Sequence, residues 1–446
     1  MVDEASGGAR AAPGSMRLGV LLVLSMAVGL GRAHAGGVAA GPWVLERAVL
    51  LQRHGVRAPT GTPAALAHYS AEPWPRWPVG PGELTAGGRR ALAAMASYIR
   101  VRYAALGMLP RTGCPAPASV YVWADSSDQR TRASGVIMAA GLAPGCSIAA
   151  SHATARRDPL FHPLEAGICP LDARLAQAQI MSRVDGKLNA LGVRYDRARR
   201  ALQAVLWPGA RDCAGPGSPC PMSHGRNRLK VMHGKLKLTG PLKVGATLSE
   251  NLLLEYADGL PSAKVGWGRA ASTERLRQIL PLHVRYSDLM RRTPEMAASG
   301  GTPLAHLLLL FLEQRPVAGA FPAAPPIPAG ARLMVLAGHD TNLANVGSIL
   351  GLDWTLAGEP DSTAPDTTLA LELWRNAPDG HEYVRAVVLY QTLAQLRAEA
   401  MGGATGTGGR AAQSVPVAFP GCNASGCPLA VVRARIESRM SRSCAP

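Results

Sequence analysis

The chain has 446 residues, of which 47% are hydrophobic and 17% are charged. This apolar content can bury a sizeable core, which excludes a disordered tail protein, and the length suits one large domain with an insertion or two domains. The net charge of +17 suits an anionic partner. However, all but six of the 47 basic residues are arginines, a bias typical of a GC-rich genome, so the charge alone does not indicate a function.

Residues 16–35 (MRLGVLLVLSMAVGLGRAHA) have the form of a secretory signal. An arginine precedes an apolar stretch that is too short for a membrane span, and an A-x-A cleavage pattern follows it. We predict a signal peptide over residues 1–35 that is cut after Ala35. Residues 1–15 are then an over-long start, and we expect a periplasmic or secreted protein.

Eight cysteines follow the predicted signal. An even number behind a signal peptide indicates disulfide bonds formed in an oxidising compartment. A metal site is the alternative, but there is no C-x-x-C pair and no histidine-rich segment beside the cysteines. The spacing suits two local pairs and leaves the partners of four cysteines open. The local pairs are Cys213/Cys220 and Cys422/Cys427, and the others are Cys114, Cys146, Cys169 and Cys444.

The start of the mature chain alternates strands with helices. Apolar segments predict strands over residues 43–52, 119–124 and 146–153. The first two lead into polar turns and then into helical patterns over residues 84–106 and 125–144. This alternation implies the α/β class, with a mainly parallel sheet flanked by helices.

Helical patterns dominate between residues 169 and 328, which we interpret as an inserted, mostly α-helical domain. Residues 303–313 (PLAHLLLLFLE) contain a histidine and end in a glutamate, so we predict a buried helix there rather than a membrane span. The proline-rich residues 319–330 predict a linker that leads back to the first domain.

After the insert the earlier pattern returns. Residues 331–354 predict strand, turn and helix, and residues 368–375 and 383–391 predict two more strands. The predicted α/β domain is therefore discontinuous, with residues 36–168 and 329–446 on either side of the insert.

Three polar turns follow apolar strands. They contain RHGVRAPT at residues 53–60, DQRTR at residues 128–132 and GHD at residues 338–340. In open α/β sheets the functional site lies beyond the carboxyl ends of the strands, so we expect these turns to meet there.

The residue types in these turns suit phosphoryl transfer. Guanidinium groups match phosphate oxygens with paired hydrogen bonds, and a neutral imidazole can attack phosphorus to form a phosphohistidine. A carboxylic acid can then protonate the leaving alkoxide. Because arginines would neutralise the phosphate charge, we expect neither a metal nor a cofactor. The predicted phosphate-binding residues are Arg53, Arg57, Arg130 and His339, and the predicted catalytic residues are His54 and Asp340.

These motifs resemble those of the histidine acid phosphatases, in particular the bacterial periplasmic 4-phytases (pH 2.5-type acid phosphatases), with glucose-1-phosphatases as near relatives. The resemblance covers nearly the whole mature chain. It implies a phosphoglycerate-mutase-like α/β domain with a helical domain over the site. It also implies the same roles for the six residues above, and it adds Thr60 and Glu250 as substrate-binding residues. The implied disulfides are Cys114–Cys146, Cys169–Cys444, Cys213–Cys220 and Cys422–Cys427.

The chain departs from this family pattern in places. Gly61 follows the Pro-Thr pair where relatives often have a lysine, and residues 364–374 (APDTTLALELW) lack the Gly-Gly of the relatives. The two short loops closed by the local cysteine pairs are also tighter than usual. None of these departures changes a predicted catalytic residue. They therefore affect only the prediction of the substrate.

Three functions compete at this point. The first is a phytase or acid phosphatase, the second is a sugar-phosphate phosphatase of the glucose-1-phosphatase kind, and the third is a non-catalytic secreted anion-binding protein. The predicted signal peptide and the cysteines argue against a cytoplasmic mutase of the same superfamily. As partners we expect a small phosphate monoester, no nucleic acid, no membrane anchor after signal cleavage, and a monomeric state.

Overall fold

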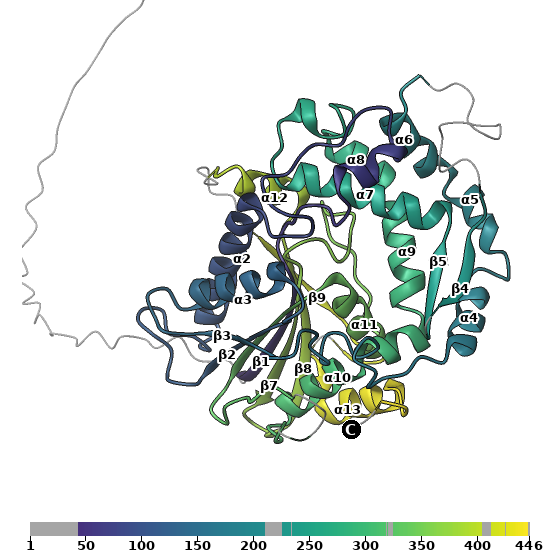
Figure 1. The fold of residues 1–446 in the computed structure, drawn as a ribbon. Helices are drawn as coiled ribbons and strands as arrows, with labels where there is room; N and C mark the ends of the chain where they lie inside the picture. Colours follow the sequence, from purple (N-terminus) through teal and green to yellow (C-terminus); the bar gives the residue numbers. More distant parts are fainter. Residues whose placement is uncertain are drawn as a thin grey trace, which may run out of the picture. The chain divides into compact units, whose positions relative to one another are not determined.

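A mixed sheet of eight strands forms the centre of the protein (Figure 1). The structure, a computed structural model, describes residues 43–209, 225–232, 234–317, 319, 324–403, 412–423 and 425–444. The predicted signal peptide and the Cys213/Cys220 pair lie outside these residues. The strands are β1 (Trp43–Arg53), β2 (Val120–Ala124), β3 (Ala150–His152), β6 (Leu333–Gly338), β7 (Thr368–Asn376), β8 (Glu382–Tyr390), β9 (Gln413–Val417) and β10 (Cys427–Pro428).

The strand order is β10-β8-β7-β1-β6-β2-β3, and β9 also pairs with β8. Strands β1, β6, β2 and β3 are parallel to one another, whereas β7 pairs with β1 and β8 in the antiparallel sense, as do β9 and β10 with β8. The α/β class is confirmed, but the sheet is mixed rather than mainly parallel. The late strands β7 and β8 follow each other through a short turn without a crossover helix, and such a connection allows only antiparallel pairing.

Helices cover both faces of the sheet. In β1, Ala48 and Leu50 pack into the core under α2 (Ala86–Ala105) and α3 (Gln129–Leu142). Val49 and Leu51 face the opposite core, which α10 (Pro294–Leu312), α11 (Asp340–Leu350) and α13 (Leu429–Arg439) complete. A central strand that is buried on both faces reads as a continuous apolar run, which is why β1 was recognised in the sequence.

Most helices of the predicted insert pack around a third core, which residues from outside the insert, among them Val56, Trp74 and Leu393, also join. Its helices are α4 (Ala173–Ser182), α5 (Leu191–Arg194), α6 (Asp196–Leu206), α7 (Pro241–Ala257), α8 (Thr273–Ile279) and α9 (Pro281–Arg291). A hairpin of β4 (Arg228–Met232) and β5 (Lys235–Thr239) joins them. The smaller elements elsewhere are α1 (Pro63–Leu66), α12 (Leu393–Ala400) and the 3₁₀ helices Ala67–Tyr69, Leu188–Ala190 and Ser262–Lys264.

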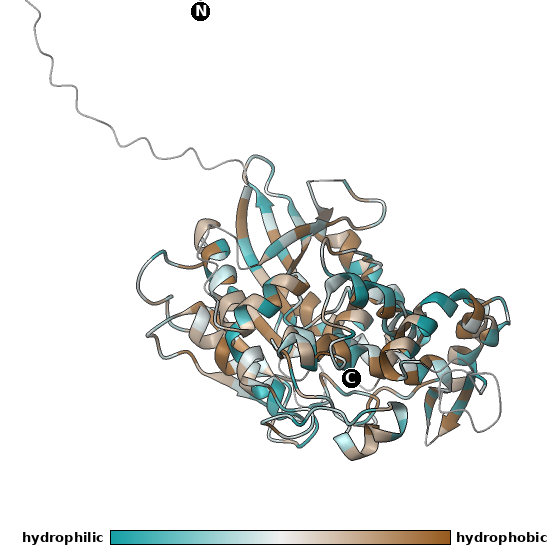
Figure 2. Ribbon diagram, turned by 90° about the horizontal axis from the view of Figure 1, so that it is seen from above, coloured by the Kyte–Doolittle hydropathy of each residue, from teal (hydrophilic) through white to brown (hydrophobic). Residues whose placement is uncertain are grey.

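Helix α10 belongs to the predicted insert by sequence but packs against the sheet. It is the one helix among the described residues that is long and apolar enough to cross a membrane, and 78% of its most apolar window is buried inside the protein. The prediction of a buried helix at residues 303–313 is therefore confirmed. Along the other covering helices, hydrophobic and hydrophilic stretches alternate (Figure 2). The limits of the insert remain a prediction.

Three disulfide bonds are present among the described residues: Cys114–Cys146, Cys169–Cys444 and Cys422–Cys427. The second joins residues 275 positions apart and attaches the carboxyl terminus to the segment before α4. In the chain-entropy account a crosslink stabilises a protein by restricting its unfolded state, more so for a longer loop.

We predict that removing Cys169–Cys444 destabilises the protein more than removing Cys114–Cys146, whose partners are only 32 positions apart. Loop entropy puts the difference at about 2 kcal/mol. The measurement is the free energy of unfolding in denaturant for the two double Cys→Ser variants. Equal losses, or a larger loss from the shorter loop, would contradict the entropic account for this chain.

A buried carboxyl group lies behind the carboxyl end of β1. Asp366 is fully buried, and neither of its carboxyl oxygens has a hydrogen-bond partner among the described residues. Its backbone has φ +66°, in the left-handed region that favours glycine. Burial raises the pKa of Asp366 to about 8, against a smaller lowering by Arg53.

Asp366 should make the protein more stable in acid than at neutral pH. A carboxyl whose folded pKa is raised holds its proton in the folded state while the unfolded chain ionises. The contribution of Asp366 to the free energy of unfolding is therefore complete below pH about 4 and is lost as the pH rises to about 8.

We expect Asp366→Asn to remove this loss of stability between acid and neutral pH, which is on the order of a few kcal/mol. The measurement is the unfolding free energy at pH 4.5 and pH 8 for both proteins. Asp353→Asn, at a side chain that is 94% exposed, is the control. The prediction fails if the Asn variant keeps the same pH dependence as the parent protein.

Candidate active site

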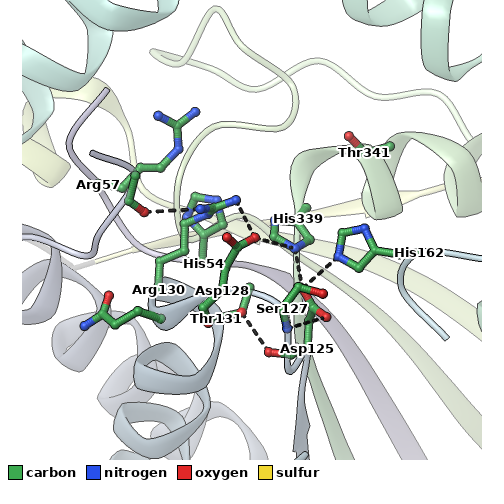
Figure 3. A network of polar contacts seen from close by, with 12 residues as sticks. His54, Arg57, Asp125, Ser127, Asp128, Arg130, Thr131, His162, His339 and Thr341 are labelled. Atoms are coloured by element: carbon green, nitrogen blue, oxygen red, sulfur yellow. Dashed lines mark hydrogen bonds and ion pairs between the residues drawn. The ribbon is translucent and has the colours of Figure 1, made fainter. Parts of the chain in front are cut away.

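The three predicted turns meet at one edge of the sheet because their strands are parallel neighbours. Strand β6 lies between β1 and β2, so all three strands end on the same side. The backbone N–H of His54 donates to Gly338 O at 2.9 Å, and that of Asp125 donates to Ala337 O at 3.0 Å. His54, Arg130 and His339 therefore come together from the three different turns (Figure 3).

The imidazole of His54 lies at the centre of this group and is 2% exposed. Its Nδ1 lies 2.8 Å from Gly55 O, an acceptor, so Nδ1 carries the proton and Nε2 keeps its lone pair. Burial first, and then the charges of Arg130 and Arg53, lower the pKa of His54 well below its usual value. The ring is therefore neutral even in moderately acidic solution, which is the state that a nucleophile needs.

Three arginines surround this ring, as predicted, and acidic side chains hold them. Glu250 Oε1 accepts hydrogen bonds from Arg53 Nη2 at 2.6 Å and from Arg57 Nη2 at 3.3 Å. Asp128 Oδ2 accepts one from Arg130 Nη2 at 2.8 Å. The Nε–H groups of all three arginines are buried and have no partner among the described residues. Buried donors of this kind are costly unless an acceptor reaches them, so the cluster is suited to an anion.

Arg53 is the most firmly fixed of the three and is 1% exposed. Its Nη1 donates to Thr363 O at 2.5 Å and lies 3.3 Å from Asp361 Oδ2. Burial disfavours its charge, but Asp340, Glu250 and Asp361 together raise its pKa above the usual value. Its positive charge is therefore permanent in the site.

His339 is held by a carboxylate that the sequence did not single out. Its Nε2 donates to Asp125 Oδ2 at 2.7 Å, and His162 Nε2 lies 2.9 Å from the same oxygen (Figure 3). Although burial opposes it, hydrogen bonds from the two histidines lower the pKa of Asp125 below its usual value. Asp125 therefore orients His339 through its Nε2–H. The polar turn after β2 was the only sequence signal for it.

Asp340 is the first residue of α11, next to the N-cap residue His339. Its Oδ2 lies 2.5 Å from Arg291 Nη1 and 3.9 Å from Arg53 Nη2. Burial raises its pKa, but Arg291, Arg53 and His283 outweigh that effect and hold the pKa well below the usual range. Asp340 is therefore a carboxylate in the structure, and its proton must arrive when the surrounding charge changes.

The helices α7 and α9 close the site from the other side. Glu250 comes from α7, and its pKa is lowered to about 2 because Arg57, His283 and Arg53 outweigh its burial. From α9 come His283, which is 3.6 Å from Asp361, and Arg291. Sequence reasoning missed both, since neither belongs to a turn that follows a strand.

Thr60, the last of the predicted residues, lies at the rim of the site and is exposed. A Cβ placed on Gly82 would come 3.5 Å from Thr60 Cγ2 and 3.3 Å from Arg130 Nη1. Thr60 is thus a near neighbour of the Arg130 guanidinium group. Its predicted role in substrate binding remains a prediction.

A pocket of about 330 Å³ opens beside Arg130, His162, His339 and Asp340. A larger one of about 760 Å³ lies by α10 and α13. Of these two pockets, the smaller one adjoins the clustered ionisable groups with shifted pKa values, although His54, Arg53 and Arg57 do not line it.

Two groups of three side chains are close enough to bind one metal ion, with their ligand atoms within 4.8 Å of one another. They are Asp125, His162 and His339, and Glu250, His283 and Asp340. In the first group the Nε2–H of each histidine is directed at Asp125, and in the second the two carboxylates face arginines. Neighbouring guanidinium charges oppose a cation, so the absence of a metal remains our expectation.

Comparisons with known proteins agree on one family. The sequence model of the histidine phosphatase superfamily (branch 2) matches residues 44–205 and 232–389. Phytase AppA of Escherichia coli (strain K12) is 37% identical over 360 residues, which cover 79% of this chain and 82% of the relative. Glucose-1-phosphatase of Salmonella typhimurium is 27% identical over 396 residues, covering 86% and 90%.

Solved structures give the same result. Hafnia alvei phytase in complex with myo-inositol hexakis sulphate has a TM-score of 0.80 and 35% identity, and the match covers 92% of this chain and all of the phytase. A family match over most of the chain, a relative above 30% identity and a shared fold agree with the three turns around His54. The chain therefore belongs to branch 2 of the histidine phosphatase superfamily.

Proposed function

We propose that this protein hydrolyses phosphate monoesters at acid pH through a phosphohistidine on His54, as a phytase or acid phosphatase. The observation that carries the proposal is a neutral, buried imidazole among three arginines whose Nε–H groups have no partner. A substrate phosphoryl group supplies the oxygens that these donors need, and it comes within reach of His54 Nε2.

The first step transfers the phosphoryl group to the protein. Nε2 of His54 attacks phosphorus in line, so that a P–N bond forms while the P–O bond to the alcohol breaks. Arg53, Arg57 and Arg130 stabilise the charge on the phosphoryl oxygens, with His339 beside them. Asp340 gives its proton to the leaving oxygen, and the alcohol departs.

The second step returns the protein to its starting state. Water attacks the phosphohistidine, and the Asp340 carboxylate accepts its proton. The P–N bond breaks, and inorganic phosphate leaves with His54 neutral again. Asp340 thus acts first as an acid and then as a base. Both roles require its carboxyl group to lie on the leaving-group side of the phosphorus rather than on the side of His54.

Acid pH is part of this proposal because of the charge around Asp340. Arg291 and Arg53 hold its pKa low. A bound phosphate dianion offsets part of the guanidinium charge and so favours the protonated acid. Lower pH increases the fraction of complexes in which Asp340 carries its proton. His54 remains neutral over the same range because its own pKa is depressed.

Phytate is the proposed substrate, and the phytase relatives at 37% and 35% identity support it. The glucose-1-phosphatase at 27% identity supports sugar phosphates as the alternative. Release of phosphate from phytate, glucose 1-phosphate and p-nitrophenyl phosphate at acid pH separates the two. A protein that binds these esters but turns over none of them would be an anion-binding protein instead.

We further propose that the protein acts outside the cytoplasm, as a monomer on a small-molecule substrate. The three disulfide bonds support an oxidising compartment. The predicted signal peptide, which lies outside the described residues, points to the same place.

We expect His54→Ala to abolish turnover while leaving the fold unchanged, since the imidazole is the proposed nucleophile. Quenching the native protein in alkali during turnover of labelled substrate should trap the label on histidine, because the P–N bond of phosphohistidine survives alkali but hydrolyses in acid. His68→Ala, at an exposed histidine, is the control and should keep full activity. Label on serine or aspartate, or a fully active His54→Ala variant, would count against the assignment.

Asp340→Asn should slow substrates with poor leaving groups, such as phytate, by roughly 10²–10⁴ in kcat. It should slow p-nitrophenyl phosphate much less, because that leaving group scarcely needs a proton. The measurement is kcat on both substrates at acid pH, with the exposed Asp379→Asn as the control. If both rates fall by the same factor, the proton donor is another acid, and Glu250 is the first to test.

A further inference from the structure

Two basic side chains from the helical region, Arg291 and Lys243, add positive charge around Asp340. Arg291, the last residue of α9, reaches the Asp340 carboxylate at 2.5 Å and is 18% exposed. Lys243 lies on α7, seven residues before Glu250. Seven residues are close to two helical turns, so Lys243 lies on the same face of α7 as Glu250.

Lys243 has the properties of a binding residue rather than of a structural one. The residue as a whole is exposed, but protein atoms surround its amine closely enough to affect its charge, and among the described residues it has no salt bridge. Its Nζ lies 4.7 Å from the ring centroid of Tyr286 on α9, so the amine is held over an aromatic face. Burial and the charge of Arg291 lower its pKa, while Glu250 and Asp340 raise it, which places the amine among the site's charges.

The position of this pair relative to the reaction is informative. Arg53, Arg57 and Arg130 surround the nucleophile, so they hold the phosphoryl group that is transferred. Asp340 protonates the leaving oxygen, so groups beside Asp340 face the alcohol part of the substrate. Two cations at that place match an anion on the alcohol part rather than an uncharged sugar.

We propose that Lys243 and Arg291 form a second anion subsite that binds another phosphate group on the leaving-group part of the same substrate. The proposal rests on the proposed function and goes further, because it names substrates with two or more phosphates as preferred. The turn after His54 adds no cation directly beyond Arg57, because Gly61 follows Thr60. Cations from α7 and α9 supply positive charge to the substrate from the helical region instead.

The subsite also connects substrate choice with the proton. A second phosphate competes with Asp340 for the Arg291 guanidinium group. When Arg291 turns to the phosphate, Asp340 loses its strongest counter-charge and takes up a proton more readily. The charged and titratable groups that face Asp340 are Arg53, Arg130, Lys243, Glu250, His283, Tyr286 and Arg291.

The test compares phytate with glycerol 2-phosphate, which also has a poor leaving group but carries no second phosphate. We expect Lys243→Ser and Arg291→Gln each to lower the ratio of kcat/KM for phytate to that for glycerol 2-phosphate by about tenfold. The exposed Lys264→Ser and Arg277→Gln are the matched controls and should leave the ratio unchanged. The difference between parent and variants should shrink at high salt.

Arg291→Gln has a second readout that a merely structural role would not change. Without the guanidinium group the pKa of Asp340 rises, so the alkaline limb of the kcat/KM profile for glycerol 2-phosphate should move to higher pH. A pH profile identical to that of the parent protein would overturn the link to the proton.

Measurements of binding affinity test the subsite without any need for turnover. In a His54→Ala background, the Kd for phytate should rise about tenfold on adding Lys243→Ser, and the Kd for inorganic phosphate should change much less. An equal change for both ligands, or no change for phytate, overturns the subsite. A parent protein that releases phosphate from no ester refutes the proposed function instead, and the binding measurement still decides the subsite.

Discussion

The buried guanidinium group of Arg53 is the constraint on which the rest of the site depends. A cation that is 1% exposed is stable only if anions and carbonyl oxygens surround it. Here they come from three distant parts of the chain: Glu250 on α7, Asp340 on α11, and Asp361 with Thr363 O in the segment before β7. Arg53 therefore links the sheet edge, the helical region and the C-terminal segment through one side chain.

This arrangement sets the charge on the two groups that the chemistry needs. Burial first, and then the charge of the surrounding arginines, disfavour a proton on the imidazole, and so His54 remains neutral. The same guanidinium charge, with that of Arg291, keeps Asp340 ionised until a substrate supplies negative charge. In the proposed reaction, a neutral nucleophile and an acid that is protonated only when substrate is bound both depend on these guanidinium charges, together with burial.

The helical region does more than cover the site. Its helices α7 and α9 provide Glu250, which bridges Arg53 and Arg57, and Arg291, which holds Asp340. In the proposed reaction, the sheet edge carries the residues that transfer the phosphoryl group, and the helical side carries charges that surround the alcohol part. Differences in substrate among relatives with the same sheet-edge motifs are therefore expected on α7 and α9.

The sequence by itself determined the α/β class and the six residues of the three turns, because each motif is local and follows a recognisable apolar strand. It also determined the family through these motifs. It did not determine the antiparallel half of the sheet, since strand direction depends on which edges pair. Only the tertiary structure brought in Arg291, His283, Asp361, Asp125 and His162, because their roles arise from contacts between elements that are distant in the chain. The low pKa of Asp340 was undecided for the same reason: it depends on which cations packing brings within 4 Å of its carboxylate.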